Sequence, residues 1–261
     1  MSKNRKHGSN PPVWVSQNFL TSQATINRLI NIAGIKKSDY IIEIGPGKGH
    51  ITNILLKKCR NLSAIEIDEN LYNKLHAKYS DVKSLKLYHQ DFLMWKLPTT
   101  EKYKVFANIP FTITSAIIQK LTQNKNPPQD AWLVVEKGAA KRFCGKPSDT
   151  LQSLLLRPFY DLNIVYHFQR EDFHPKPGVD VVVLHISQKT ESDVTLSQQK
   201  LYCNFIAHGL KFGLFSKHAL LTKRQISTAL RVAKLNPIKA SGEILYIQWL
   251  CLFRCWLKFN K

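Results

Sequence analysis

The 261-residue sequence is poor in acidic residues: 18 Asp and Glu face 38 Lys and Arg, which gives a formal net charge of +20. Residues 185–261 are the most densely basic large segment, with 12 basic residues against three acidic ones. So strong an excess of one sign indicates a polyanionic partner, either nucleic acid or an acidic membrane surface.

Paired cysteines and long apolar runs are missing as well. The five cysteines are scattered and show no CxxC spacing, which argues against a disulfide framework or a zinc site and favours a reducing, cytoplasmic location. The opening residues, MSKNRKHGSN, contain no apolar core typical of a secretory signal. The most apolar stretch, Ile244–Phe259, is interrupted by Gln248, Arg254 and Lys258 and is shorter than the roughly 20 apolar residues that a membrane span needs. We therefore expect a buried or docking helix there, and neither a membrane span nor a bound metal.

The rest of the chain alternates between strand-like and helix-like segments. The run YIIEIG at 40–45 is rich in β-branched residues, a helical stretch follows at 49–58, and a second apolar run, LSAIEID, occupies 62–68. A strand, a helix and a strand within about 30 residues are the pattern of a parallel sheet. The same alternation predicts further strands at 84–91, 103–110 and 130–137, and helices at 21–34, 69–79, 114–122 and 150–158.

The C-terminal part of the chain has a different pattern. Two consecutive strands are predicted at 163–171 and 179–187 with no helix between them, which indicates an antiparallel pair at the sheet edge. From about Ser197 the pattern is helical, with a break at 235–241 and Ser241 as the expected N-cap of the last helix. We therefore predict a basic N-terminal arm (1–15), an α/β domain (16–190) and a small all-helical domain (191–261).

Three glycines, Gly45, Gly47 and Gly49, alternate in EIGPGKGHIT between a predicted strand and a predicted helix. Glycine allows a tight turn and a close approach of the backbone to a ligand, and the helix N-terminus offers free N–H groups. About 20 residues later Glu66 ends the next strand, where a carboxylate can accept hydrogen bonds from both hydroxyls of a ribose. The ligand should therefore contain a nucleoside, with a GxGxG spacing that departs from the usual dinucleotide pattern.

A third feature, HQDF, ends the following strand. Asp91 can accept a hydrogen bond from an adenine amine while Phe92 covers the ring; for Asp91 alone, a solvated strand-end carboxylate is an equally good interpretation. Together the three features resemble class I methyltransferases that use S-adenosylmethionine, over roughly residues 16–187. The resemblance implies a Rossmann-like α/β fold with a mostly parallel sheet.

The fourth predicted strand ends on Asn108, Ile109, Pro110 and Phe111, at the carboxyl edge of the sheet where open α/β sheets bind ligands. The exocyclic amine of a base is a poor nucleophile because its lone pair is delocalised into the ring. If the Asn108 side-chain oxygen and the Ile109 carbonyl accept its two N–H bonds, the lone pair is freed for methyl transfer. Pro110 would stiffen this turn, and Phe111 could stack on the base, a contact worth roughly 1–3 kcal/mol.

Two more motifs narrow the family. SQNFL at 16–20 and FHPKPGVDVVVL at 173–184, taken with the glycine turn and NIPF, resemble the ribosomal RNA adenine N6-methyltransferases. That resemblance implies that Phe173 is a second aromatic ring against a flipped base. It also implies cofactor contacts for Gln17, Asn18, Leu20, Ile67 and Asn108.

The C-terminal segments LLTKRQISTAL (220–230) and EILYIQWLCLFRCWLKFN (243–260) resemble the Erm branch of this family. The resemblance implies methylation of the 23S RNA of the large subunit and resistance to macrolides, lincosamides and streptogramin B. The alternatives are a small-subunit dimethyltransferase of ribosome biogenesis, a DNA adenine methyltransferase, and a catalytically silent RNA-binding protein on the same fold. The sequence leaves open whether one or two methyl groups are added.

Charge indicates where RNA would bind. Lys141 and Arg142 follow the fifth predicted strand, and further basic residues occupy a predicted helical segment after the sheet, namely Lys217, Lys223, Arg224 and Arg231. A solvated helical face explains any one of them, but their number favours contact with phosphates as a group. The sequence predicts no obligate protein partner.

Overall fold

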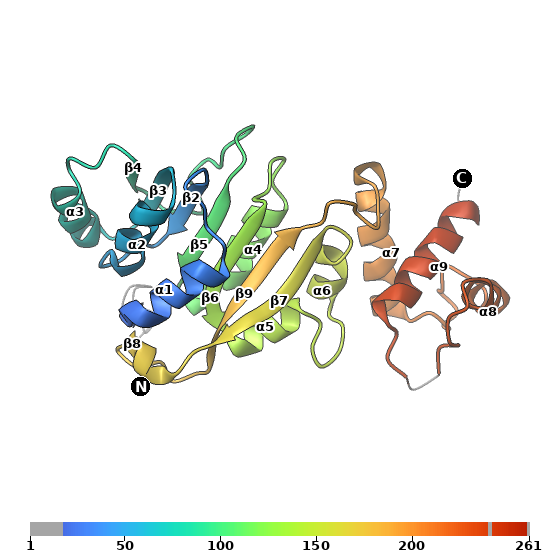
Figure 1. Ribbon diagram of the computed structural model, residues 1–261. Helices are drawn as coiled ribbons and strands as arrows, with labels where there is room; N and C mark the ends of the chain where they lie inside the picture. Colours follow the sequence, from blue (N-terminus) through green and yellow to red (C-terminus); the bar gives the residue numbers. More distant parts are fainter. Residues whose placement is uncertain (1–17, 240–241, 260–261) are drawn as a thin grey trace, which may run out of the picture. The chain divides into compact units, whose positions relative to one another are not determined.

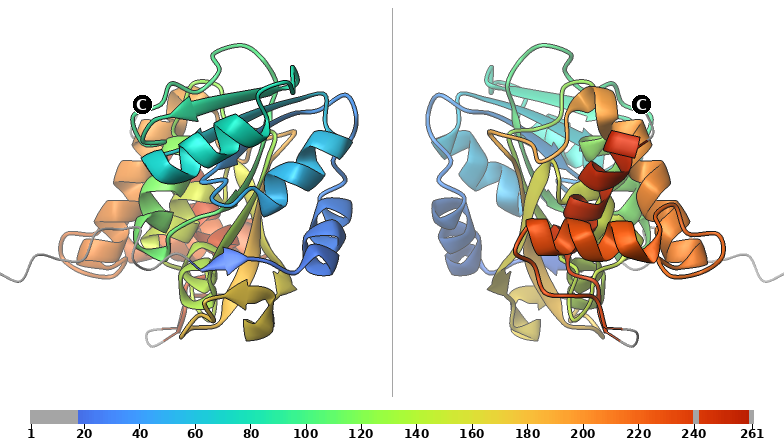
Figure 2. Two further views of the ribbon diagram at one scale, coloured as in Figure 1. Left: turned by 90° about the vertical axis from the view of Figure 1, so that its left-hand side faces the viewer. Right: turned by 90° about the vertical axis from the view of Figure 1, so that its right-hand side faces the viewer.

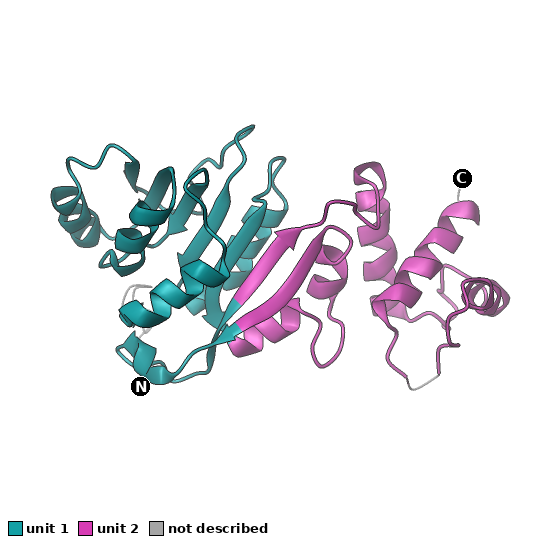
Figure 3. Ribbon diagram, in the orientation of Figure 1, with its two compact units in different colours: residues 1–136, 166–183 teal, residues 137–165, 184–261 magenta. Residues whose placement is uncertain are grey.

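The chain divides into two compact units (Figure 3). The computed structural model describes residues 18–239 and 242–259. The first unit comprises residues 1–136 and 166–183, and the second comprises residues 137–165 and 184–261. The predicted arm at 1–15 lies outside the described residues.

A seven-stranded sheet, in the order β4-β3-β2-β5-β6-β9-β7, forms the framework (Figure 1). Its strands are β2 (Tyr40–Ile44), β3 (Asn61–Glu66), β4 (Leu85–His89), β5 (Lys104–Asn108), β6 (Asp130–Glu136), β7 (Tyr160–His167) and β9 (Val181–Gln188). Strands β2 to β6 pair in parallel. β7 and β9 run antiparallel, because Lys189 N donates to Phe159 O (2.9 Å) at one end and Phe168 N donates to Val181 O (3.1 Å) at the other. The predicted mostly parallel sheet with an antiparallel edge pair is confirmed.

Two of the four helices described for the first unit, α1 and α3, begin with a side-chain cap. Ser22 Oγ accepts a hydrogen bond from Thr25 N (3.3 Å) at the start of α1, and Asp68 Oδ1 accepts one from Leu71 N (2.9 Å) at the start of α3. The helices are α1 (Gln23–Ile32), α2 (His50–Lys58), α3 (Glu69–Lys78) and α4 (Thr114–Thr122), with 3-10 turns at Phe111–Ile113 (η2) and Arg170–Asp172 (η3). All four helices lie close to their predicted ranges.

The middle strands of the first unit are buried on both faces. Consecutive residues such as Ile41 and Ile42 of β2, or Val105 and Phe106 of β5, are fully buried, which is the pattern of parallel strands covered by helices. α1 packs against α2, and α3 packs against β3 and β4 (Figure 2). Because β2, β3 and β5 are parallel neighbours, the loops that follow them lie at one carboxyl edge of the sheet.

Three short elements are not anticipated by the sequence patterns: β1 (Phe19–Leu20), β8 (Phe173–His174) and α5 (Lys137–Phe143). β1 and β8 form a separate antiparallel pair, in which Phe19 aligns with His174 and Leu20 with Phe173. A strand of two residues carries no periodicity of its own, so only the pairing of distant segments defines it.

The second unit has a helical core. It contains α6 (Leu151–Leu156), α7 (Gln199–Phe212), α8 (Lys223–Val232) and α9 (Tyr246–Phe259), with a 3-10 turn at Leu196–Gln198 (η4). Tyr202 and Phe205 of α7 pack against Phe253 of α9, with ring centroids 5.1 and 5.7 Å from the Phe253 ring. Leu154 of α6 belongs to the same cluster, and its carbonyl accepts a hydrogen bond from the Tyr202 hydroxyl (2.9 Å). α6 packs on α7, and the second compact unit includes residues 137–165 and 184–190 together with the predicted helical domain of 191–261.

Two expectations for the helical region are corrected. The last helix begins at Tyr246, because Gln248 Oε1 accepts a hydrogen bond from Leu245 N (2.8 Å) at its start; Ser241, the expected cap, lies outside the described residues. A second break, at 213–222, separates α7 from α8, so Lys217 lies in a turn rather than on a helix. No described helix combines the length and the apolarity that crossing a membrane requires.

Candidate active site

The glycine turn between β2 and α2 adopts a backbone that favours glycine. Gly45, Gly47 and Gly49 have φ angles of 65°, 58° and 78°, all in the left-handed region. A Cβ atom added at Gly47 would lie 2.8 Å from the Phe19 ring, so an aromatic side chain already packs directly against this backbone. The turn therefore lets other groups approach it closely, as the sequence predicts.

Glu66, at the end of β3, holds the glycine turn in place. Its Oε2 accepts a hydrogen bond from Gly47 N (2.9 Å), and its Oε1 accepts bonds from Ile67 N (2.9 Å) and Asp68 N (3.0 Å). The residue is only 1% exposed. Burial raises the pKa of the Glu66 carboxyl, while the three backbone N–H groups act in the opposite direction. A carboxylate with a donor at each oxygen is a rigid acceptor at this edge of the sheet.

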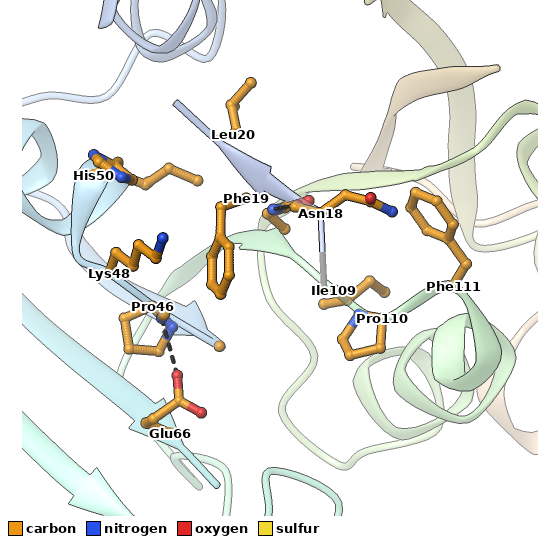
Figure 4. A pocket seen from close by; sticks show the side chains of 14 residues that line it. Asn18, Phe19, Leu20, Pro46, Lys48, His50, Glu66, Ile109, Pro110 and Phe111 are labelled. Atoms are coloured by element: carbon orange, nitrogen blue, oxygen red, sulfur yellow. Dashed lines mark hydrogen bonds between the residues drawn. The ribbon is translucent and has the colours of Figure 1, made fainter. Parts of the chain in front are cut away.

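A narrow cavity of about 50 Å³ lies at this edge (Figure 4). It brings together most of the predicted residues: Asn18, Leu20, Gly45, Gly47, Glu66, Asn108, Ile109, Pro110 and Phe111. Five further residues line the cavity that the sequence patterns did not predict as site residues: Phe19, Pro46, Lys48, His50 and Ile51. All five lie inside the motifs SQNFL and EIGPGKGHIT, so membership of these motifs was the sequence signal that could have identified them. The Phe19 ring projects toward the glycine turn, and Lys48 Nζ lies 4.9 Å from its centroid.

Four predicted cofactor residues do not line this cavity, and Gln17 lies outside the described residues. Ile67 is 59% exposed, and a Cβ at Gly49 would meet Leu75 at 2.7 Å, so this glycine serves helix packing. Asp91 Oδ1 accepts a hydrogen bond from the backbone N–H of Leu93 (2.8 Å).

The fourth, Phe92, is buried and stacks on Trp95 with centroids 6.3 Å apart. In this conformation the Phe92 ring belongs to the core, and its role of covering an adenine ring stays a prediction.

Asn108 ends β5 with a defined amide orientation. Its Nδ2 donates to the Asn18 carbonyl (2.9 Å), which identifies the other amide atom, Oδ1, as the acceptor available to a ligand. Ile109 is buried, and Phe111 is half-buried in the turn that follows Pro110. The NIPF residues therefore present an amide oxygen and a ring at the edge of the same cavity that the glycine turn lines.

Phe173, the predicted second ring against the flipped base, lies in the short strand β8. It is 2% exposed, it pairs with Leu20 in the β1–β8 ladder, and its ring packs edge-on against Phe168 at 5.0 Å. The ring is not available to a flipped base in this conformation, because pairing with β1 turns it into the interior.

The predicted RNA-binding residues are all exposed and all belong to the second unit. Lys141 and Arg142 lie on α5, Lys217 lies in the turn after α7, and Lys223, Arg224 and Arg231 lie on α8. The cavity at the glycine turn belongs to the first unit.

Glu43, directly below the glycine turn in β2, is a second buried carboxyl. It is 1% exposed, and neither of its oxygens has a hydrogen-bond partner of good geometry within the described residues. Burial raises the pKa of Glu43 to about 8, and the neighbouring Thr52 acts in the opposite direction. Glu43 is therefore mainly protonated at neutral pH.

We expect Glu43 to make the stability of the fold depend on pH. Below about pH 4.5 the carboxyl is protonated in both folded and unfolded chains; between about 4.5 and 8 only the folded chain keeps the proton. The free energy of unfolding should therefore fall as pH rises through this window, by a few kcal/mol in order of magnitude. Thermal unfolding of the parent and of Glu43→Gln at about pH 5 and pH 8.5 checks this. Glu191→Gln, which removes an exposed carboxylate, is the control. If the stability of the parent and that of Glu43→Gln changed equally between the two pH values, this expectation would be contradicted.

The parallel α/β sheet, the glycine turn and the strand-end carboxylate define a class I methyltransferase that uses S-adenosylmethionine. The chain belongs to the ribosomal RNA adenine dimethylase family, whose model matches residues 13–211.

Two curated relatives, the rRNA adenine N-6-methyltransferases of Escherichia coli and Limosilactobacillus reuteri, are each 33% identical to this chain. The matches cover 96% and 94% of this chain, and 98% and 97% of the relatives. The crystal structure of the 23S rRNA methyltransferase ErmE is similar over 92% of this chain and 99% of its own, with a TM-score of 0.80 and 25% identity. The chain is therefore an rRNA adenine N6-methyltransferase, and the predicted Erm-type family, enzyme class and cofactor are confirmed.

Proposed function

We propose that this enzyme methylates the N6 amine of one adenosine in the 23S RNA of the large subunit and so confers resistance to macrolides, lincosamides and streptogramin B. One observation supports the proposal: ErmE, a 23S rRNA methyltransferase, matches 92% of this chain with a TM-score of 0.80, whereas a dimethyladenosine transferase from Plasmodium falciparum matches 93% of it with a TM-score of 0.70. Both matches include the helical second unit, and the fit to ErmE is the better of the two.

The residues at the glycine turn fit the cofactor. S-adenosylmethionine supplies an electrophilic methyl group on a sulfonium. Gly45 and Gly47 present backbone without side chains, and Glu66 is the acceptor for ribose hydroxyls. Phe19 lies against Gly47 in this conformation, where the free space is smaller than a nucleoside, so the ring has to move aside when the cofactor enters.

The NIPF residues, Asn108 to Phe111, make the target amine a better nucleophile. Asn108 Oδ1 and the Ile109 carbonyl accept the two N–H bonds of the target amine, which draws its nitrogen toward tetrahedral geometry and frees the lone pair. The bond from Asn108 Nδ2 to the Asn18 carbonyl holds the amide in the orientation that this requires. Phe111 stacks on the extruded base. Catalysis then rests on positioning and on fixed dipoles, because an aminium product loses its proton to water without a strong base.

The test incubates the protein with purified large-subunit and small-subunit RNA and labelled S-adenosylmethionine, and then maps modified adenosines by primer extension. We expect label on one adenosine of the large-subunit RNA, together with macrolide resistance in a sensitive host that expresses the protein. Label confined to small-subunit RNA would contradict the proposal and favour the dimethyltransferase of ribosome biogenesis. Mass spectrometry of the labelled nucleoside distinguishes one methyl group from two.

The basic residues of α8 provide a separate prediction about RNA. Neutralising Lys223 and Arg224 together should weaken RNA binding and lower the slope of log affinity against log salt by roughly 1.4 to 1.8, since up to two phosphate contacts are lost. Neutralising Lys57 and Lys58, an exposed pair at the end of α2, serves as the control. A salt slope that stays at the parent value would show that the α8 pair does not face RNA.

A further inference from the structure

The helical unit carries an open groove between α8 and α9, with a volume of about 580 Å³. α8 lines it with Ala229 and Val232, and α9 lines it with Ile247, Cys251 and Phe259. Val232 is 76% exposed, Ile247 47% and Phe259 62%. Three large apolar side chains thus face solvent around one depression, which is a mark of an interaction site.

α9 explains why the groove is apolar. One face of this helix, with Trp249, Leu252 and Phe253, is buried in the core of the unit. Another face, with Ile247 and Cys251, lines the groove. The same face also carries Arg254 and Lys258, so its apolar residues lie beside positive charges. Within the described residues, this second face of α9 is exposed.

The walls of the groove suit a helix better than a nucleotide. Small side chains at Ala229, Ala233 and Cys251 keep the floor low, so the backbone of a third helix can approach. Stacking of an RNA base needs aromatic rings, and Phe259, at the end of α9, is the one ring among the lining residues.

The charge of the lining residues further restricts which partner can occupy the groove. Arg224, Arg254 and Lys258 line the groove, and the lining residues include no Asp or Glu. A second copy of this chain, with a net charge of +20, would bring the same positive groove against it. The complementary occupant carries carboxylates beside its apolar face.

We propose that the α8–α9 groove docks an acidic amphipathic helix of another protein, with aliphatic side chains at i, i+3 or i+4 and i+7 and carboxylates along its flanks. This is a protein-binding function in addition to methyl transfer. It does not depend on which RNA is modified, and it explains why the chain keeps an apolar stretch, Ile244–Phe259, that the helical core uses on only part of its surface.

Peptide binding to the full-length protein tests this. The probe is a fluorescent synthetic peptide as long as α9, 14 residues, with leucines at the stated spacing and glutamates elsewhere; the comparison peptide has lysines in place of glutamates. Fluorescence anisotropy should show saturable binding of the acidic peptide and at least tenfold weaker binding of the lysine peptide.

Two variants with matched controls locate the site. Val232→Glu should weaken binding of the acidic peptide about tenfold or more, because an apolar contact is replaced by a repelling charge. Leu196→Glu, at an apolar residue that is 79% exposed outside the groove, should not. Lys258→Glu should weaken binding, and Lys200→Glu, on the exposed side of α7, should leave it unchanged.

The groove cysteines provide a second readout. In a Cys203→Ser background, Cys251 and Cys255 are the partly exposed thiols, since Cys59 and Cys144 are buried. The acidic peptide should slow their reaction with a maleimide, and Val232→Glu should remove that protection while methylation of RNA continues. Equal binding of both peptides, protection by a uridine oligonucleotide instead of the peptide, or protection by self-association at high protein concentration would each overturn the proposal.

Discussion

Asn108→Ala is expected to lower kcat about a hundredfold or more while affinity for RNA hardly changes. The substitution removes the side-chain oxygen that accepts an N–H bond of the target amine, and losing one pre-organised polar group from a transition state has effects of this size. It also removes the Nδ2 bond to the Asn18 carbonyl (2.9 Å), which holds β1 next to β5. Single-turnover methylation with saturating cofactor on an RNA hairpin with the target adenosine measures the rate.

A second substitution separates the two roles of the amide. Asn108→Asp keeps an oxygen acceptor but cannot donate to the Asn18 carbonyl, so we expect a rate between those of the parent and Asn108→Ala. Asn61→Ala, at an exposed position where β3 begins, should turn over at the parent rate. If Asn108→Ala also did so, the NIPF turn would be structural and the mechanism above would be wrong.

Glu66→Gln is expected to weaken S-adenosylmethionine binding at least tenfold and to lower the thermal unfolding midpoint. The carboxylate accepts three backbone N–H bonds while 1% exposed, and an amide offers only one oxygen acceptor in its place. Either the N–H group of Gly47 or both N–H groups of the Ile67–Asp68 turn then lose their acceptor, at a cost of about 1–3 kcal/mol for each group. Calorimetric titration and thermal unfolding measure the two effects.

The comparison with Glu66→Ala separates binding from stability. Alanine leaves all three N–H groups without their acceptor, so the unfolding midpoint should fall further than for Gln. Glu69→Gln, an exposed acidic residue in the first turn of α3, should change neither quantity appreciably. If Glu66→Gln bound the cofactor as tightly as the parent does, Glu66 would not be the residue that contacts the ribose.

The parts of the site that the sequence predicted are those with a local cause. Alternating glycines after a β-branched run specify a turn of positive φ, and the structure places Gly45, Gly47 and Gly49 there. The parallel order of the strands brings the ends of β2, β3 and β5 to one edge of the sheet. Glu66 and Asn108 therefore line one cavity, although they are 42 residues apart in the sequence.

For the aromatic residues of the site, contacts between segments far apart in the sequence decided which rings are buried and which face the cavity. Phe173 begins a motif whose resemblance implies contact with a base, and in the structure it is 2% exposed and pairs with Leu20 in the β1–β8 ladder. Phe92 follows a strand end as the motif requires, and packing against Trp95 draws its ring into the core. Phe19 lies within the motif SQNFL, and the tertiary fold alone places its ring against Gly47.

The sequence by itself determined the class of this protein: the periodicity of its strands and helices, the glycine turn with its acidic partner, and NIPF at a strand end are all short-range patterns that any correct fold has to satisfy. The tertiary structure alone decided which aromatic rings face the cavity and which are buried, and left one face of α9 open beside α8. The reason is physical, since the burial of a ring depends on apolar surface contributed by residues far away in the chain, and no local pattern records that contribution.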